Sequence, residues 1–110
     1  MQPYTLRYTA NAYIMITNAL DKHVEDMAPA MEKKSLDRAD YLTFMAACQL
    51  QGKFSSNMNS IVIDTAEQLC VLDDIVDDLL EHAGVLRARD LALHLKPIQI
   101  QLMTALEANV

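Results

Sequence analysis

A long run of apolar residues at helical spacing, from Asn57 to Ala83, constrains this chain more than any other feature. Apolar and small residues recur there at alternating steps of four and three, which is typical of one face of an amphipathic helix. They are Met58, Val62, Thr65, Leu69, Leu72, Val76, Leu79 and Ala83. At 1.5 Å per residue the helix would be roughly 40 Å long, more than a compact domain of this size needs. We therefore expect it to pack against a second copy or a partner as well as its own chain.

Capping residues and a proline delimit two helices before this one. The first is predicted over residues 9–28, because threonine can cap its start and Pro29 lacks a backbone donor. The second begins after Ser35 or Asp37, either of which can accept hydrogen bonds from free N–H groups, and it ends near Gly52. The two helices and the long one should run antiparallel, joined by short turns.

The end of the long helix and the last segment complete the predicted fold. Gly84 can take the left-handed conformation that closes a helix, and His82 lies in its last turn. A fourth helix follows from Val85 or Arg87, and Pro97 should kink or divide it. The fold class is therefore all-α: an antiparallel bundle of three to four helices with one long central helix, expected to dimerise, in a single domain over residues 1–110.

The first eight residues leave two alternatives open. Tyr4, Leu6 and Tyr8 alternate with polar residues as in a strand, yet they lead directly into a helical pattern. An extended arm and an early helix start both fit. Tyr4, Tyr8 and Tyr13 are candidate partner contacts, because tyrosine is enriched in interfaces, but they also suit the core of a first helix.

Charge and composition exclude several classes of protein. The chain has 110 residues, of which 52% are hydrophobic, and a formal net charge of −6. An acidic surface repels nucleic acid and anionic lipid, so we expect neither partner. The chain has no run of ~18 apolar residues and no secretory pattern at its start, which favours a cytoplasmic protein. Cys48 and Cys70 match no metal spacing and would lie about 12 Å out of register, so an internal disulfide is not expected.

A cluster of four aspartates is the strongest chemical motif. Asp73, Asp74, Asp77 and Asp78 form the run DDIVDD, which resembles the aspartate-rich DDxxD motif of prenyl diphosphate synthases. That resemblance implies magnesium held against a diphosphate. It covers six residues, no second such motif follows, and the all-α fold of that family needs a much longer chain. The resemblance therefore does not assign an activity.

A smaller magnesium-dependent phosphohydrolase is the enzymatic alternative. If the second helix pairs antiparallel with the long helix, Asp37 falls near residue 73 and Asp40 near residue 70, so two acidic pairs would meet. The Glu-rich pattern of all-α nucleotide pyrophosphohydrolases is absent from this chain. The simpler interpretation is that the aspartates form the solvated face of their helix, where Lys33 and Lys34 could offset their charge.

No cofactor, metal or catalytic residue is predicted. His23, His82 and His94 are scattered, and Asp78 with His82 supplies only two ligands at one-turn spacing. No serine or cysteine is placed with a base beside a glycine-rich turn.

Protein binding is the function that the patterning favours. Between Ile61 and Leu72 apolar residues leave the main stripe, and a helix that is apolar on several faces is buried on several faces. Ile63, Cys70 and Val71 are accordingly the candidate contacts with a basic or apolar protein partner or a second copy. The alternative is that the long helix is central in its own bundle and is covered on all sides by its own chain. The predicted role is a regulatory adaptor, anti-activator or inhibitor that masks a larger target. A toxin-neutralising immunity protein or a purely structural bundle shares the same features.

Overall fold

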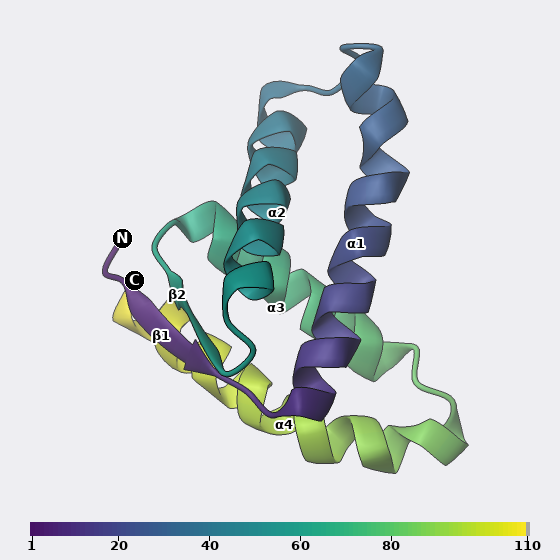
Figure 1. Cartoon of the computed structure of the whole chain (residues 1–110), viewed down its shortest axis with the longest axis vertical. Coiled ribbons are helices and arrows are strands. Elements are labelled where there is room, and N and C mark those ends of the chain that lie inside the picture. Colours follow the sequence, from purple (N-terminus) through teal and green to yellow (C-terminus); the bar gives the residue numbers. More distant parts are fainter. Residues whose placement is uncertain (110) are drawn as a thin grey trace.

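Four helices and a small sheet make up the chain. The computed structural model describes residues 1–109, with the side chains of all of these except residues 85–88. In Figure 1, two long helices stand side by side as a hairpin, a third crosses behind them, and the fourth lies along the lower edge beside the strands. The elements are β1 (Tyr4–Arg7), α1 (Ala10–Glu32), α2 (Arg38–Ser56), β2 (Ser60–Ile63), α3 (Ala66–Glu81) and α4 (Val85–Ala108). The predicted predominance of helix is confirmed, whereas the all-α class is wrong because β1 and β2 pair.

The first third of the predicted long helix is a loop and a strand. Three consecutive β-branched residues occupy 61–63, and such side chains pack better on a pleated strand than in a helix. In β2 the side chains of Ile61 and Ile63 are buried while Val62 is 46% exposed, which is the alternation of a strand. β1 pairs antiparallel with β2, Tyr4 opposite Ile63 and Leu6 opposite Ile61. The extended alternative for the first residues is therefore an ordered strand.

A cap at Thr65 explains why α3 begins only at Ala66. The Thr65 hydroxyl accepts a hydrogen bond from the Gln68 N–H at 3.2 Å, and Gln68 Oε1 reaches back toward the Asp64 N–H at 3.4 Å. This reciprocal arrangement resembles a capping box, whose T-x-x-Q pattern is readable in the sequence. α3 is consequently 16 residues long, and the predicted helix of 27 residues is wrong.

The starts of α1 and α2 agree with the prediction, whereas the C-terminal ends of α1 and α3 differ from it. Thr9 and Asp37 cap α1 and α2 as predicted, each accepting a hydrogen bond from the N–H three residues on. α1 nevertheless continues through Pro29 and closes at Lys34, which has a φ of 54°. The Ser35 N–H donates to Ala30 O across this left-handed residue. Gly84 has a φ of −60°, so the predicted left-handed glycine after α3 is wrong, and His82 is the C-cap instead.

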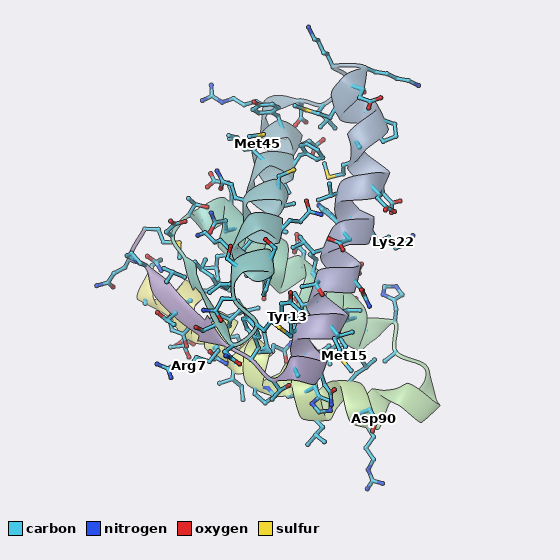
Figure 2. The ribbon with its side chains drawn as sticks, in the orientation of Figure 1. Arg7, Tyr13, Met15, Lys22, Met45 and Asp90 are labelled. Atoms are coloured by element: carbon cyan, nitrogen blue, oxygen red, sulfur yellow. The ribbon has the colours of Figure 1, made fainter. Side chains whose placement is uncertain are left out.

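One hydrophobic core joins the helical hairpin to the sheet and to α4. α4 continues through Pro97 and buries Leu95, Ile98 and Leu102 on one face. At the centre, the Phe54 ring is 1% exposed and lies 5.4 Å from the Tyr8 ring and 6.1 Å from the Tyr13 ring, measured between centroids. In Figure 2 Tyr13 lies between the lower parts of α1 and α2. Aromatic packing therefore ties the N-terminal segment to the end of α2.

Candidate functional site

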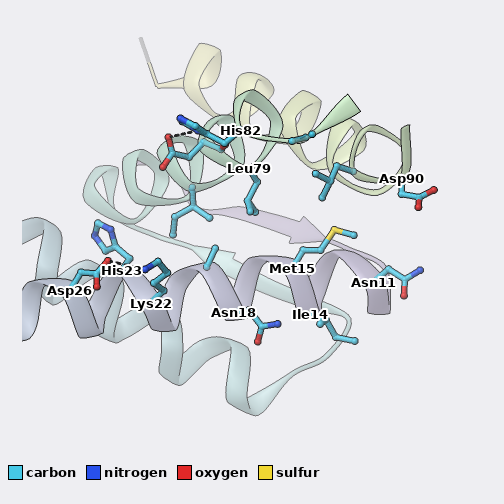
Figure 3. A pocket seen from close by; sticks show the side chains of 16 residues that line it. Asn11, Ile14, Met15, Asn18, Lys22, His23, Asp26, Leu79, His82 and Asp90 are labelled. Atoms are coloured by element: carbon cyan, nitrogen blue, oxygen red, sulfur yellow. Dashed lines mark hydrogen bonds and ion pairs between the residues drawn. The ribbon is translucent and has the colours of Figure 1, made fainter. Parts of the chain in front are cut away.

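A groove of about 790 Å³ lies on the described part of the chain, and we call it the α1–α3 groove. It lies between α1 and the corner where α3 leads into α4 (Figure 3). Figure 3 shows Met15 and Leu79 pointing from the two facing helices into the space between them. Its apolar lining comes mainly from three helices and consists of Ile14, Met15, Ala19, Ile75, Leu79, Ala83 and Leu91. Ile14 is 54% exposed, so part of this lining faces water.

Charged and titratable side chains surround the apolar lining. Asp26 of α1, Asp78 of α3 and Asp90 of α4 contribute carboxylates, and Lys22 is the one cation among the described lining residues. Lys22 Nζ lies 3.7 Å from Asp26 Oδ2, and both side chains are mostly exposed. Counting only the side chains that the structure describes, the lining carries a net negative charge.

The three histidines, which are far apart in the sequence, lie at or beside this groove. His23 and His82 line it, and His94 lies beside it, with its Nε2 3.1 Å from Nδ2 of the lining residue Asn11. Nε2 of His23 is buried and has no hydrogen-bond partner among the described residues. His82 Nδ1 lies 3.0 Å from the Asp78 carbonyl oxygen and 3.5 Å from Asp78 Oδ1. These two residues thus form a local pair at the end of α3.

The potential metal ligands that converge are not those of the predicted hydrolase site. Among side chains that the structure describes, one group of three brings its ligand atoms within 4.8 Å of one another: Asp78, Glu81 and His82. All three are exposed and belong to one helical turn. Such a group can approach a divalent cation from one side, but no other histidine, cysteine or acidic side chain that the structure describes joins it to complete a cage.

The aspartate run of α3 is divided between solvent and α4. Asp74 and Asp78 are exposed, whereas Asp73 and Asp77 are half-buried. Asp77 Oδ1 accepts a hydrogen bond from Gln99 Nε2 of α4 at 3.1 Å. Burial, followed by the charges of Asp77 and Asp74, raises the pKa of the Asp73 carboxyl. The predicted solvated face thus holds for two of the four carboxylates.

The antiparallel register assumed for α2 and the long helix is wrong, because β2 intervenes. α3 begins where Gln68 faces Gln49 and Lys53 of α2, at hydrogen-bond distances of 2.9 Å. Asp37 caps the opposite, upper end of α2, so it and Asp40 do not meet the aspartates of α3 (Figure 1). No ion pair of the described residues joins Lys33 or Lys34 to that run.

Two of the three predicted contact residues on the long helix lie inside the chain's own core. Ile63 is 0% exposed and Val71 is 2% exposed, so their apolar character is explained by intramolecular packing. Cys70 is exposed, and partial burial together with Asp74 raises the pKa of its thiol. Cys48 and Cys70 are both free, in agreement with the expected absence of an internal disulfide.

The predicted tyrosine contacts are engaged within the chain. The Tyr8 hydroxyl donates to the Asn57 carbonyl at 2.7 Å and the Tyr13 hydroxyl donates to the Phe54 carbonyl at 3.1 Å. Burial and the neighbouring Tyr13 raise the pKa of Tyr8 to about 12. Tyr4 is half-buried against the core. All three have intramolecular packing roles, so their part in a contact with another protein remains a prediction.

Sequence reasoning missed the groove residues of α1. Nothing in the sequence distinguishes Ile14 and Met15 from the other apolar residues of the first predicted helix. A helix that is apolar on more than one side is a signal for a second packing surface, yet it does not say which element lies opposite. In the structure, the corner between α3 and α4 lies opposite α1 at this surface.

Neither a family model, nor a curated protein, nor a solved structure matches this chain. Among the described residues, no helix is both long and apolar enough to cross a bilayer.

Proposed function

We propose that this chain is a binding protein that holds a segment of another protein in the α1–α3 groove. The observation that carries the proposal is the lining of the groove, apolar in its floor and acidic around it, contributed by three helices. Concave sites with an apolar floor and a few placed charges are typical of recognition surfaces. The predicted class, a small acidic protein that acts by protein–protein binding, is thereby retained with a different contact surface.

The lining favours a partner segment with an apolar face flanked by lysine or arginine. Fully burying an isoleucine side chain contributes about 1.5–3 kcal/mol, so covering the half-exposed Ile14 would add about 1 kcal/mol. Asp78 and Asp90 lie on the α3–α4 side and Asp26 on the α1 side, where they would attract basic residues of the approaching segment. Such charges act mainly on the association rate and on the choice of partner. An amphipathic basic helix is the simplest segment with these properties.

A protein that occupies a partner's amphipathic segment can mask it, as an adaptor, an anti-activator or an inhibitor does. An immunity protein would use the same physical mechanism, and the identity of the partner separates these roles. The magnesium-dependent hydrolase gains no support from a specific observation, since Asp37 and Asp40 lie away from Asp73 and Asp77. Binding is therefore the only function we put forward.

The test is a peptide-display selection on the purified protein, followed by affinity measurements on the enriched peptides. We expect peptides that combine apolar and basic residues, and Ile14→Glu should weaken them about tenfold because it places a charge on the exposed apolar edge of the groove. Asp90→Lys should weaken them several-fold, mainly through slower association. Met58→Glu is the matched control, because Met58 is 61% exposed and outside the groove.

Two results would count against the proposal. One is a selection that enriches no peptide. The other is a set of peptides whose affinity responds to Met58→Glu as strongly as to Ile14→Glu, which would locate binding elsewhere on the chain.

A further inference from the structure

α4 carries a second apolar face, on the side opposite to the core. Leu93, Ile100 and Met103 are 71%, 63% and 52% exposed. At 100° per residue the centre of this row lies about 150° around the helix from the centre of the buried Leu95, Ile98 and Leu102. α4 forms the lower edge of the molecule in Figure 1, where no other element of the chain lies beyond it. We call this exposed row of side chains the α4 stripe.

Two opposite charges complete the α4 stripe. Lys96 precedes Ile100 by four residues, and Glu107 follows Met103 by four residues. These four side chains and Leu93 fall within an arc of about 80° on the helix surface. Within the described chain neither charge is part of an ion pair; Lys96 only donates to Gln99 at 3.2 Å on the surface. From Leu93 to Glu107 the order along the stripe is thus apolar, cation, apolar, apolar, anion.

We infer that the α4 stripe is the contact with a second copy of this chain, with the two α4 helices packed antiparallel. A two-fold axis midway between Ile100 and Met103 sets Ile100 of each copy against Met103 of the other. The same symmetry sets Lys96 of each copy against Glu107 of the other, because both lie four residues outside the apolar pair. One contact is therefore repeated twice, as a two-fold dimer requires.

The charge order discriminates between arrangements of the two helices. A parallel pair would place Lys96 against Lys96 and Glu107 against Glu107, and both contacts are repulsive. The antiparallel pair converts them into two attractive contacts, which offset part of the repulsion between two chains of net charge −6. The antiparallel dimer is consequently the favoured state of the stripe.

This dimer would make the protein bivalent. Asp90 lines the groove near the start of α4, and the two-fold axis lies 11 to 12 residues further along the helix. At 1.5 Å per residue the two grooves would be about 35 Å apart, at opposite ends of the helix pair. The bivalency rests on the proposed function of the groove, whereas the dimer does not.

The test is sedimentation equilibrium of the full chain over a range of concentrations. Lys96→Glu and Glu107→Lys should each raise the dimer dissociation constant about tenfold, since each turns two attractive contacts into repulsive ones. The double variant restores both contacts and should dimerise like the wild type. An equimolar mixture of the two single variants should form the heterodimer in preference to either homodimer. Lys33→Glu, the same charge change at the far end of the hairpin, is the control and should leave the dimer unchanged.

Several outcomes would overturn the inference. They are a wild-type chain that stays monomeric at millimolar concentration, single variants that dimerise like the wild type, or a double variant that fails to recover. Ile100→Asp should abolish the dimer with an unchanged circular dichroism spectrum, which separates lost association from lost folding. Ile14→Glu should leave the dimer intact, so a failure of groove binding and a failure of dimerisation can be distinguished.

Discussion

Lys53 is the residue on which three segments of this fold meet. Its Nζ donates to the Val62 carbonyl at 2.6 Å, to Asp64 Oδ1 at 2.9 Å and to Gln68 Oε1 at 2.9 Å. Gln68 is 2% exposed, and its Nε2 donates to Gln49. The lysine therefore covers the outer edge of β2 and satisfies a buried acceptor at the start of α3. Its hydrogen bond and charge also lower the pKa of the Asp64 carboxyl.

Replacing Lys53 by methionine should destabilise the fold. The substitution keeps the length of the side chain but removes its three N–H donors. The buried Gln68 oxygen and the Val62 carbonyl then each lose the hydrogen bond that Lys53 donates. Losing the partner of a buried acceptor costs about 1–3 kcal/mol. We expect a loss of free energy of unfolding in that range, measured by urea denaturation. Lys22→Met is the matched control, because its ion pair with Asp26 is exposed and should contribute less than about 1 kcal/mol. Equal losses in the two variants would contradict this role for Lys53.

Among the secondary-structure elements, the two-stranded sheet is bounded by side chains of neighbouring helices, which cover its open edges. Gln101 of α4 accepts from the Arg7 N–H at 2.9 Å and donates to the Arg7 carbonyl at 2.7 Å, so it occupies the free edge of β1. Lys53 does the same for β2. A two-stranded sheet has two open edges, which otherwise invite pairing with other chains. Both edges are covered here by polar side chains from neighbouring helices.

α1 tolerates Pro29 at a cost that can be measured. Proline removes the hydrogen bond that residue 29 would donate to the Glu25 carbonyl, and it lowers helix stability by up to about 3 kcal/mol relative to alanine. Pro29→Ala restores the donor but makes the unfolded chain more flexible, which offsets up to about 1 kcal/mol. We expect a net gain of about 1–2 kcal/mol and a midpoint of thermal unfolding higher by roughly 5–10 °C.

The control for Pro29 is Pro3→Ala, which lies before β1 outside any helix and should leave the midpoint unchanged. An unchanged or lower midpoint for Pro29→Ala would mean that the proline favours the turn at 33–37 more than it weakens the helix.

In the molecule as a whole, an aromatic cluster joins the hairpin of α1 and α2 to the sheet and α4. The molecule measures 40 × 33 × 27 Å along its principal axes. Because it is this small, one core connects the hairpin of α1 and α2 to the sheet and to α4. Phe54 stands at this connection, with the rings of Tyr8 and Tyr13 around it. The hydroxyls of Tyr8 and Tyr13 also donate hydrogen bonds to the carbonyls of Asn57 and Phe54, which stabilises the turn into β2.

Phe54→Ala should therefore cost more than any surface change. Removing a buried phenylalanine typically costs about 3–5 kcal/mol, which is a large share of the 5–15 kcal/mol that holds a small domain together. Phe44→Ala, at a half-buried position of the same helix, should cost clearly less. Chemical denaturation of both variants measures the difference. Equal losses would show that the cluster at Phe54 is no more important than the periphery of the hairpin.

Helix-forming segments and their starts were predictable from local chemistry, and the site was not. The caps at Thr9 and Asp37 act within three residues, so they are readable in the sequence. The T-x-x-Q box at Thr65 was equally readable, but a helical spacing that continued by chance through Met58 and Val62 concealed it. Of the predicted contacts Ile63, Cys70 and Val71, only Cys70 lies at the surface, because Ile63 of β2 and Val71 of α3 pack inward.

Capping and amphipathic periodicity are local properties, so a mostly helical, acidic chain with α1 and α2 as a hairpin follows from the order of its residues. The pairing of β1 with β2 across more than fifty residues depends instead on the assembled fold, as does the late start of α3, which leaves Asp37 and Asp40 away from Asp73 and Asp77. The assembled fold also sets which apolar residues remain uncovered, among them Ile14 at the groove and Ile100 on α4. Burial depends on which elements meet in space, and periodicity within one element carries no information about its neighbour.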